Sequence, residues 1–163
     1  MNIAILSDSH DNTENLSKAI KILQEKHITE AIHLGDFVNP NAIRLFKDTH
    51  IHLTGIFGNN DGEVFGLTKA FQDVDGTLAG HFYETTFGDK TVGCYHGTVT
   101  ELKDSLITSK KYDIVLYGHD HTAFDEVLDG VHAINPGTLH GFGKRASFVI
   151  YDTDAHTVEF IDL

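Results

Sequence analysis

The chain has 163 residues, of which 40% are hydrophobic and 22% are charged, and we expect residues 1–163 to form one globular domain. The formal net charge of −12 leaves no basic face for a polyanion, so stable nucleic-acid binding is not expected. The single cysteine cannot form an internal disulfide, no apolar run approaches the roughly 20 residues of a membrane span, and no signal peptide is recognisable. These features predict a cytoplasmic protein without a membrane association.

The first part of the chain alternates between predicted strands and helices. Apolar runs predict three strands, at residues 3–6, 31–34 and 51–57. Helical spacing of apolar residues begins after Asn12 or Thr13, and Asn39-Pro40 supplies the cap and the first position of a second helix. A third helix is expected after Asp61. Strand–helix–strand order of this kind predicts a parallel sheet with right-handed crossovers.

The rest of the chain is richer in strands. Two-residue turns at 88–89, 129–130 and 153–154 are expected to join residues 81–87 to 90–95, 123–128 to 131–134, and 146–152 to 156–161. One more helix is expected to begin at the capping box formed by Thr98 and Glu101. Two sheets whose outer faces are covered by helices are the simplest architecture, which gives an α/β (α+β) fold class.

Side chains that can bind a metal follow five of the predicted strands. In an extended backbone Asp8 and His10 point the same way, because they are two residues apart. Ligands of open α/β sheets collect outside the carboxyl ends of the strands, so we expect all of these side chains to converge. The candidate metal ligands are Asp8, His10, Asp36, Asn59, His96, His119 and His121.

The number of candidate ligands points to two metals rather than one. Seven ligands are too many for a tetrahedral zinc ion, whereas two metals that share one carboxylate would use them all, and Asp36 is the natural bridge. Two metals about 3.5–4 Å apart can hold the attacking and leaving oxygens of an in-line phosphoryl displacement. The pattern therefore indicates a two-metal site suited to phosphoryl displacement.

The same residues also resemble a known family. The motifs Asp8-x-His10, Gly35-Asp36, Gly58-Asn59-x-Asp61, His96-Gly97 and Gly118-His119-x-His121 resemble the five motifs of the calcineurin-like metallophosphoesterases. With its Asn135-Pro136-Gly137-Thr138 turn and its length, the chain resembles the small single-domain prokaryotic phosphodiesterases of that superfamily. The resemblance implies a four-layer αββα sandwich of two mixed β-sheets flanked by helices, and a dimetal centre.

The resemblance also implies how the ligands are shared. Asp8, His10, Asp36 and His121 would hold one divalent metal, and Asp36, Asn59, His96 and His119 would hold the other. A hydroxide that bridges the metals would attack a small phosphodiester in line. Mn²⁺ is the expected metal, and Ni, Fe, Co and Zn are alternatives that the donor types also admit. Whether the chain forms a homo-oligomer stays open, with Phe65 and Phe142 as apolar candidates for an interface.

One position departs from the family pattern. Many relatives carry a histidine where this chain has Asn60, and that histidine can protonate the leaving group. The amide of Asn60 can donate a hydrogen bond to a phosphoryl oxygen but cannot supply a proton, so we expect a preference for good leaving groups. Asp61 is expected to orient a metal ligand such as His10. Asn60 and Asp61 are therefore the candidate catalytic residues.

Other reactive side chains are given ordinary interpretations. His33 is expected to be packed or hydrogen-bonded within its strand, and Cys94 to be a buried strand residue. His140 and Arg145 stay open, since either could border the site. The segment 141–146 matches a dinucleotide fingerprint only formally, because it precedes a strand rather than a helix. The remaining histidines are taken as structural or exposed: His27, His50, His52, His81, His132 and His156.

Three other functions remain as alternatives. A phosphomonoesterase or nucleotide hydrolase would use the same metals, although basic groups that suit a dianionic phosphate are scarce near the motifs. A non-catalytic protein-binding scaffold, of the kind that a eukaryotic retromer subunit builds on this fold, would be expected to lack some ligands. A regulatory metal-binding module would bind metal without turnover.

Overall fold

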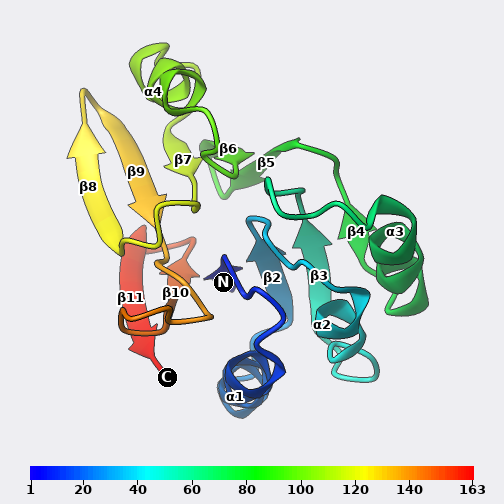
Figure 1. Ribbon diagram of the computed structural model, residues 1–163. Coiled ribbons are helices and arrows are strands. Elements are labelled where there is room, and N and C mark those ends of the chain that lie inside the picture. The colour runs from blue at the N-terminus through cyan, green and yellow to red at the C-terminus, as the bar shows by residue number, and fades with distance from the viewer.

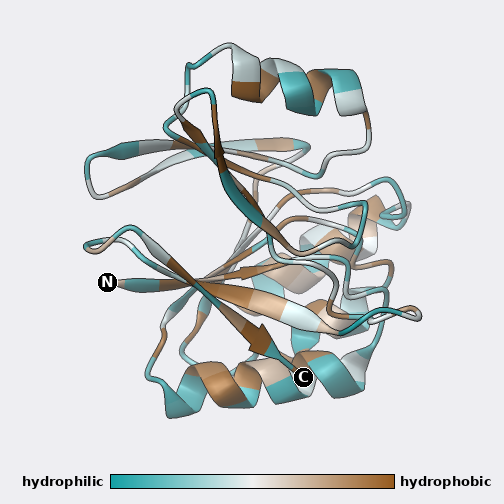
Figure 2. Ribbon diagram, turned by 90° about the vertical axis from the view of Figure 1, so that its left-hand side faces the viewer, coloured by the Kyte–Doolittle hydropathy of each residue, from teal (hydrophilic) through white to brown (hydrophobic).

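Two β-sheets lie face to face in the computed structural model, which describes residues 1–163, and helices cover both outer faces (Figure 1, Figure 2). The helices are α1 (Thr13–Glu25), α2 (Pro40–Arg44), α3 (Val64–Asp73) and α4 (Thr100–Thr108). Helices α1 to α3 cover one sheet and α4 covers the other, so the predicted four-layer αββα sandwich is confirmed. No helix combines the length and the apolar character that a membrane span needs.

Both sheets are mixed. The six-stranded sheet has the order β11 (Thr157–Asp162), β10 (Ser147–Asp152), β1 (Asn2–Leu6), β2 (Glu30–His33), β3 (His52–Gly55) and β4 (Thr77–Leu78). The five-stranded sheet has the order β5 (Phe82–Phe87), β6 (Lys90–Tyr95), β7 (Ile114–Leu116), β9 (Val131–Asn135) and β8 (Phe124–Leu128). Strands β1 to β4 are parallel, as are β6, β7 and β9, while antiparallel strands β10, β11, β5 and β8 form the remainder.

The parallel strands bring the sequence motifs to one side of the sandwich. Because neighbouring parallel strands end at the same edge, the loops that follow them are adjacent. The backbone N–H of Asp8 donates to the carbonyl of Gly35 (3.0 Å), and that of Gly118 donates to the carbonyl of His96 (2.8 Å). The loops of both sheets also meet each other, since the N–H of His119 donates to Asp8 Oδ2 (3.1 Å).

Strand alternation divides the apolar residues between the layers. On β1, Ala4 and Leu6 pack towards α1 to α3, whereas Ile3 and Ile5 pack against the other sheet. On β7, Val115 belongs to the apolar cluster beneath α4. Figure 2 shows hydrophobic residues along the strands between the helical layers. The core therefore lies in three layers, and both sheets are buried on their inner and outer faces at the centre.

Three helices begin with a side-chain cap. The side chain of Asn12 accepts from the N–H of Asn15 (3.0 Å), and that of Asn39 accepts from the N–H of Asn41 (2.9 Å). The predicted Asn39 cap is confirmed, and of the two candidates for the first helix Asn12 is the cap. Glu63 caps α3 in the same way. Each cap satisfies an amide that the first turn of a helix leaves free.

The predicted capping box of α4 is wrong. Helix α4 begins at Thr100 with Val99 at the N-cap position, and no side chain caps it. Thr98 lies before the N-cap position, and its hydroxyl donates to Asn59 Oδ1 (3.4 Å). Glu101 falls in the first turn, where its charge favours the positive end of the helix dipole.

Two of the three hairpins have the predicted turns, and the third is longer. Phe87 pairs with Lys90 and Leu128 with Val131, which leaves two-residue turns. Asp152 pairs with Thr157, so residues 153–156 form a four-residue loop. The longer loop is stabilised locally, because Asp152 Oδ1 accepts hydrogen bonds from two of its backbone N–H groups (2.8 and 2.9 Å). The two-residue strand β4 was also missed, since it is too short to show a period.

A cavity separates the sheets at the end remote from the motif loops. Its volume is about 190 Å³, and its lining includes Ile3 of β1, Ile32 of β2, and Tyr83 and Phe87 of β5. These residues lie near the amino-terminal ends of β1 and β2 and along the β5–β6 hairpin. The inter-sheet layer is therefore less completely filled at this end.

Leu53→Ala tests the layer beneath the helices. Leu53 on β3 is fully buried in the cluster that packs against α1 to α3. Removing its side chain should lower the free energy of unfolding by about 2–5 kcal/mol, through lost burial and the cavity that remains. Urea unfolding measures the change, and Val127→Ala, at a residue that is 67% exposed, should stay within about 0.5 kcal/mol of the parent. Equal losses in both variants would contradict this layer assignment.

Candidate metal centre

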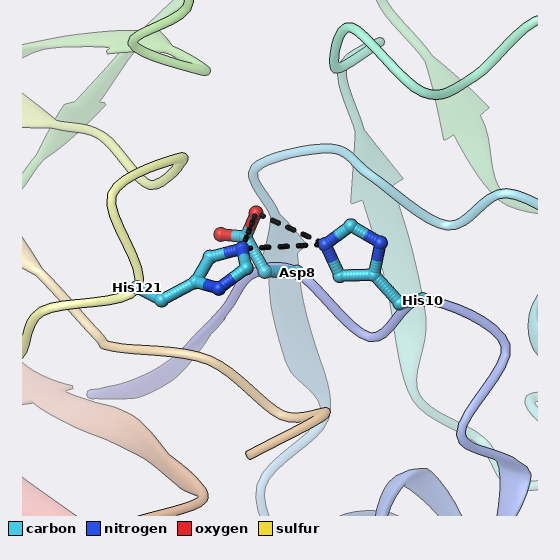
Figure 3. A group of neighbouring side chains, drawn as sticks. All are labelled: Asp8, His10 and His121. Atoms are coloured by element: carbon cyan, nitrogen blue, oxygen red, sulfur yellow. Dashed lines mark hydrogen bonds and ion pairs between the residues drawn. The ribbon is translucent and has the colours of Figure 1, made fainter. Parts of the chain in front are cut away.

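Five of the predicted ligands form two overlapping groups around Asp8. Asp8, His10 and His121 form one group (Figure 3), and Asp8, Asp36 and His96 form the other. Asp8 Oδ1 lies 3.2 Å from His121 Nε2, 3.7 Å from His10 Nε2 and 4.0 Å from His96 Nε2. The loops after β1, β2, β6 and β7 thus deliver one carboxylate-rich cluster that spans both sheets.

Asp36 and the two remaining ligands complete the cluster. Asp36 Oδ2 lies 3.4 Å from His96 Nε2 and 3.6 Å from His10 Nε2, so this carboxylate stands between the two sets of histidines. Asn59 Oδ1 lies 3.1 Å from His96 Nε2. The ring of His119 meets that of His96 edge-on, with 5.3 Å between the centroids. All seven predicted side chains therefore lie together, Asn59 and His119 on the His96 side.

The donor set fits divalent cations. Asp8 Oδ1 is buried and has no hydrogen-bond partner in the protein. A buried, unpaired carboxylate oxygen is costly, and its neighbours within 4 Å are histidine nitrogens rather than lysine or arginine groups. Burial by itself raises the pKa of Asp8, but the nearby imidazoles of His10 and His121 outweigh it and hold that pKa far below its usual range. The carboxylate is therefore charged and available as a ligand.

The backbone at the ligands is left-handed. The φ angles are positive at Asp8 (53°), His10 (41°), Asp36 (58°), His119 (72°) and His121 (60°). This conformation is uncommon outside glycine, and residues held in it cluster at functional sites. Aspartate and histidine are among the side chains that adopt it most readily. The same turns that end the strands therefore aim the ligands inward.

Hydrogen bonds around the cluster fix the histidine rings. His96 Nδ1 lies 2.7 Å from the carbonyl of Leu34, so Nδ1 carries the proton and Nε2 is free to bind a metal. His33 is buried beside the cluster, where its Nδ1 accepts from the N–H of Gly35 (3.2 Å) and its Nε2 donates to Ser9 Oγ (3.0 Å). Burial lowers the pKa of His33 to about 3, so this ring is neutral. The prediction of a packed strand histidine is confirmed.

Asp61 supports Asp36 rather than His10. Its carboxylate accepts from the backbone N–H groups of Asp36, Gly58 and Val38, each at 2.8 Å. Burial raises the pKa of Asp61, and these three donors act in the opposite direction. Asp61 thus positions a candidate ligand as expected, but that ligand is Asp36 rather than His10, because the turn at Gly58 places the carboxylate under the loop that follows β2. Asp61 therefore positions the backbone on which Asp36 is held.

Asn60 holds the Asp36 carboxylate from the solvent side. Its backbone N–H donates to Asp36 Oδ1 (2.8 Å), and its side-chain amide donates to Asp36 Oδ2 (2.7 Å). Burial raises the pKa of Asp36, whereas His96 and, to a smaller extent, these two bonds from Asn60 lower it. The net effect is a lowered pKa, which favours the charged carboxylate. Asn60 is exposed, so its amide stands between the ligands and the solvent.

Of the residues left open by the sequence, one borders the site. The rings of His140 and His10 lie 6.0 Å apart, edge to face. Arg145 pairs on the surface with Asp162. Cys94 is buried in β6, where burial raises the pKa of its thiol well above the usual range.

Phe142 was missed as a neighbour of the ligands. Its ring centroid lies 5.2 Å from that of His10, and the ring is 56% exposed. The sequence predicted at most an apolar surface residue here, since no motif includes this position.

A close approach at Gly118 yields a test of the cluster. A Cβ at this position would overlap Ser7 Oγ and lie 2.7 Å from Asp8 Oδ2. Gly118→Ala should therefore displace Asp8 and weaken Mn²⁺ binding about 10- to 100-fold, as other disturbances around metal ligands do. Calorimetric titration of the metal-stripped protein measures the affinity.

Gly62→Ala is the matched control, because nothing lies within 4 Å of a Cβ at that position. It should bind Mn²⁺ as the parent does. Unchanged affinity in Gly118→Ala would show that Asp8 is not a ligand.

Proteins of known class resemble the chain in both sequence and structure. The family model described as the calcineurin-like phosphoesterase superfamily domain matches residues 1–156. A phosphodiesterase of Methanocaldococcus jannaschii is 34% identical over 143 residues, which cover 87% of this chain and 86% of that protein. The solved structure of an archaeal phosphodiesterase has a TM-score of 0.93 at 33% identity, with both chains fully covered. Vps29 of Chaetomium thermophilum has a TM-score of 0.74 at 14% identity, covering 100% of this chain and 94% of its own, and shares the fold alone.

Proposed function

The chain belongs to the calcineurin-like phosphoesterase superfamily, and from that premise we propose that it is a dimetal phosphodiesterase acting on small phosphodiesters. The observation that carries the proposal is the buried Asp8 oxygen, which has no protein partner and faces three histidines. Such an oxygen calls for a cation, and an acidic protein needs cations to bind an anionic ester.

The ligands divide between two positions. One metal would be held by Asp8, His10, Asp36 and His121, and the other by Asp36, Asn59, His96 and His119. Two divalent cations there supply Lewis acidity, which lowers the pKa of water and neutralises phosphoryl oxygens. We propose Mn²⁺ from the set of metals that mixed carboxylate, imidazole and amide donors admit, which also includes Ni, Fe, Co and Zn.

The surrounding residues keep this arrangement rigid and set its limits. Asp61 accepts hydrogen bonds from three backbone N–H groups, including that of Asp36. His33 is neutral and therefore adds no positive charge. Asn60 can turn its amide from Asp36 to a phosphoryl oxygen, but it has no proton to give to a leaving group. We therefore expect water to protonate poor leaving groups, and esters of acidic alcohols or phenols to react fastest.

Charge favours a diester over a monoester. A dianionic phosphate is usually met by lysine or arginine, and neither type lies within 4 Å of the carboxylates of Asp8 and Asp36. The lysine on the neighbouring loop, Lys144, donates instead to the Asp120 carbonyl (2.9 Å) and Thr122 Oγ1 (2.8 Å). A monoanionic diester needs less positive charge, so it suits this site better.

Metal add-back tests the proposal. Mn²⁺ added in steps to metal-stripped protein should raise the hydrolysis of bis(4-nitrophenyl) phosphate until two equivalents are bound, with much less hydrolysis of 4-nitrophenyl phosphate. Asp36→Asn should reduce diester turnover at least 100-fold, because both metals would lose a shared charged ligand. Asp125→Asn, on the surface strand β8, is the control and should keep full turnover.

The alternatives give different outcomes in this experiment. Dominant hydrolysis of the monoester would favour a phosphomonoesterase or nucleotide hydrolase. Metal binding without turnover of either ester would favour a scaffold or a regulatory module.

Asn60→His tests the missing proton donor. An imidazole at this exposed position can protonate a leaving alcohol, whereas the amide cannot. The substitution should raise kcat for alkyl diesters with poor leaving groups, by about 10-fold or more, and leave 4-nitrophenyl diesters nearly unchanged. A plot of log kcat against leaving-group pKa should therefore become flatter. An equal change for all esters would contradict a role in leaving-group protonation.

A further inference from the structure

An exposed aromatic ring stands beside the metal ligands without a role in holding them. Phe142 lies on the segment between Thr138 and Ser147, and its side chain is 56% exposed. Glycines on both sides, Gly141 and Gly143, have positive φ angles of 87° and 71°. These glycines allow the chain to turn sharply before and after the ring, so a bulky apolar side chain is presented to the solvent rather than packed into the core.

The ring of Phe142 is oriented by three histidines. It meets His10 edge-on, with 5.2 Å between centroids and 72° between planes, and is nearly parallel to His121, at 6.2 Å and 12°. His140 stacks on it with 21° between planes. His140 Nδ1 also accepts the backbone N–H of Phe142 (3.2 Å), which ties the two residues together. We call the rings of His140 and Phe142 the aromatic pair.

The loop that carries the aromatic pair is fastened to the metal-ligand loop. Lys144 Nζ donates to the carbonyl of Asp120 (2.9 Å) and to Thr122 Oγ1 (2.8 Å), the residues on either side of His121. Arg145 pairs with Asp162 at the end of β11. The position of Phe142 relative to the ligands is therefore set by the protein.

There is also room next to the ligands. A cavity of about 340 Å³ adjoins His121, and Lys144 and Arg145 contribute to its lining. The same loop thus borders the metal ligands, a cavity and an exposed aromatic ring. A phosphoester whose phosphate is held at the metals would place a substituent within reach of Phe142, because the ring of Phe142 lies 5.2 Å from that of His10.

We propose that Phe142 is a specificity-determining residue that stacks on a planar aromatic substituent of the substrate, such as an aryl group or a nucleobase. The position of the phosphate rests on the proposed function. Stacking suits this ring because it is exposed and already stacks on the ring of His140. Alkyl phosphodiesters of the same charge would bind the metals equally well but lack this contact.

Binding of two phosphonates tests the proposal without any turnover. Zn²⁺-loaded protein is titrated calorimetrically with phenylphosphonate and with methylphosphonate, which share the metal-binding group and differ in the ring. The parent should bind phenylphosphonate about 10-fold more tightly, within the range that stacking of a ring on an aromatic side chain provides. Phe142→Leu should bring the ratio close to one and leave methylphosphonate affinity unchanged.

Two further variants separate stacking from bulk. Phe142→Trp should keep the preference, and because the chain has no tryptophan its emission should respond to phenylphosphonate and not to methylphosphonate. Phe65→Leu makes the same substitution at a phenylalanine that is 90% exposed on α3, and should keep the parent ratio.

The outcomes distinguish this proposal from the proposed function. No preference in the parent, or a preference retained in Phe142→Leu, would overturn the stacking role. A preference that depends on Phe142 in a protein that hydrolyses neither ester would support the stacking role and refute the phosphodiesterase. Diester hydrolysis without any aromatic preference would refute the stacking role alone.

Discussion

The burial of the Asp8 carboxylate is the constraint around which the loops are arranged. Its backbone N–H donates to Gly35, its carbonyl accepts from Thr138 Oγ1 (3.0 Å), and its Oδ2 accepts from the N–H of His119. One residue therefore contacts three segments that are far apart in the sequence. The remaining oxygen is unpaired, and a buried negative charge of this kind is tolerable where cations complete it.

The site is held in an uncommon backbone conformation by a rigid surrounding. Left-handed residues cost free energy, and here they are stabilised by hydrogen bonds from outside the loops, such as those of Asp61 to the turn after β2. Val38 is an example, because a φ of 69° is rare for a β-branched residue. Its backbone N–H donates a hydrogen bond to Asp61, which helps to hold this conformation. Stability supplied by the core thus maintains the ligand geometry before any metal binds.

The sequence predicted the parts of the structure that depend on local pattern. Asn12 was one of two predicted caps, and Asp36 was placed at a strand end among the other candidate ligands, because strand ends and helix starts have short-range signals. Thr98 was misread, since the helix begins one residue later than predicted and the Thr98 hydroxyl contacts a loop distant in sequence. Asp61 was assigned the wrong partner and Phe142 no site role for the same reason. Their contacts depend on how separate loops pack, which no local pattern encodes.

The two ends of the sandwich differ in how the sheets meet. At the site end, His96 of one sheet bonds the carbonyl of Leu34 of the other (2.7 Å), and His119 bonds Asp8. At the opposite end a cavity lies between the sheets. Because candidate ligands come from both sheets and these hydrogen bonds join the sheets beside them, sliding one sheet past the other would change the ligand distances.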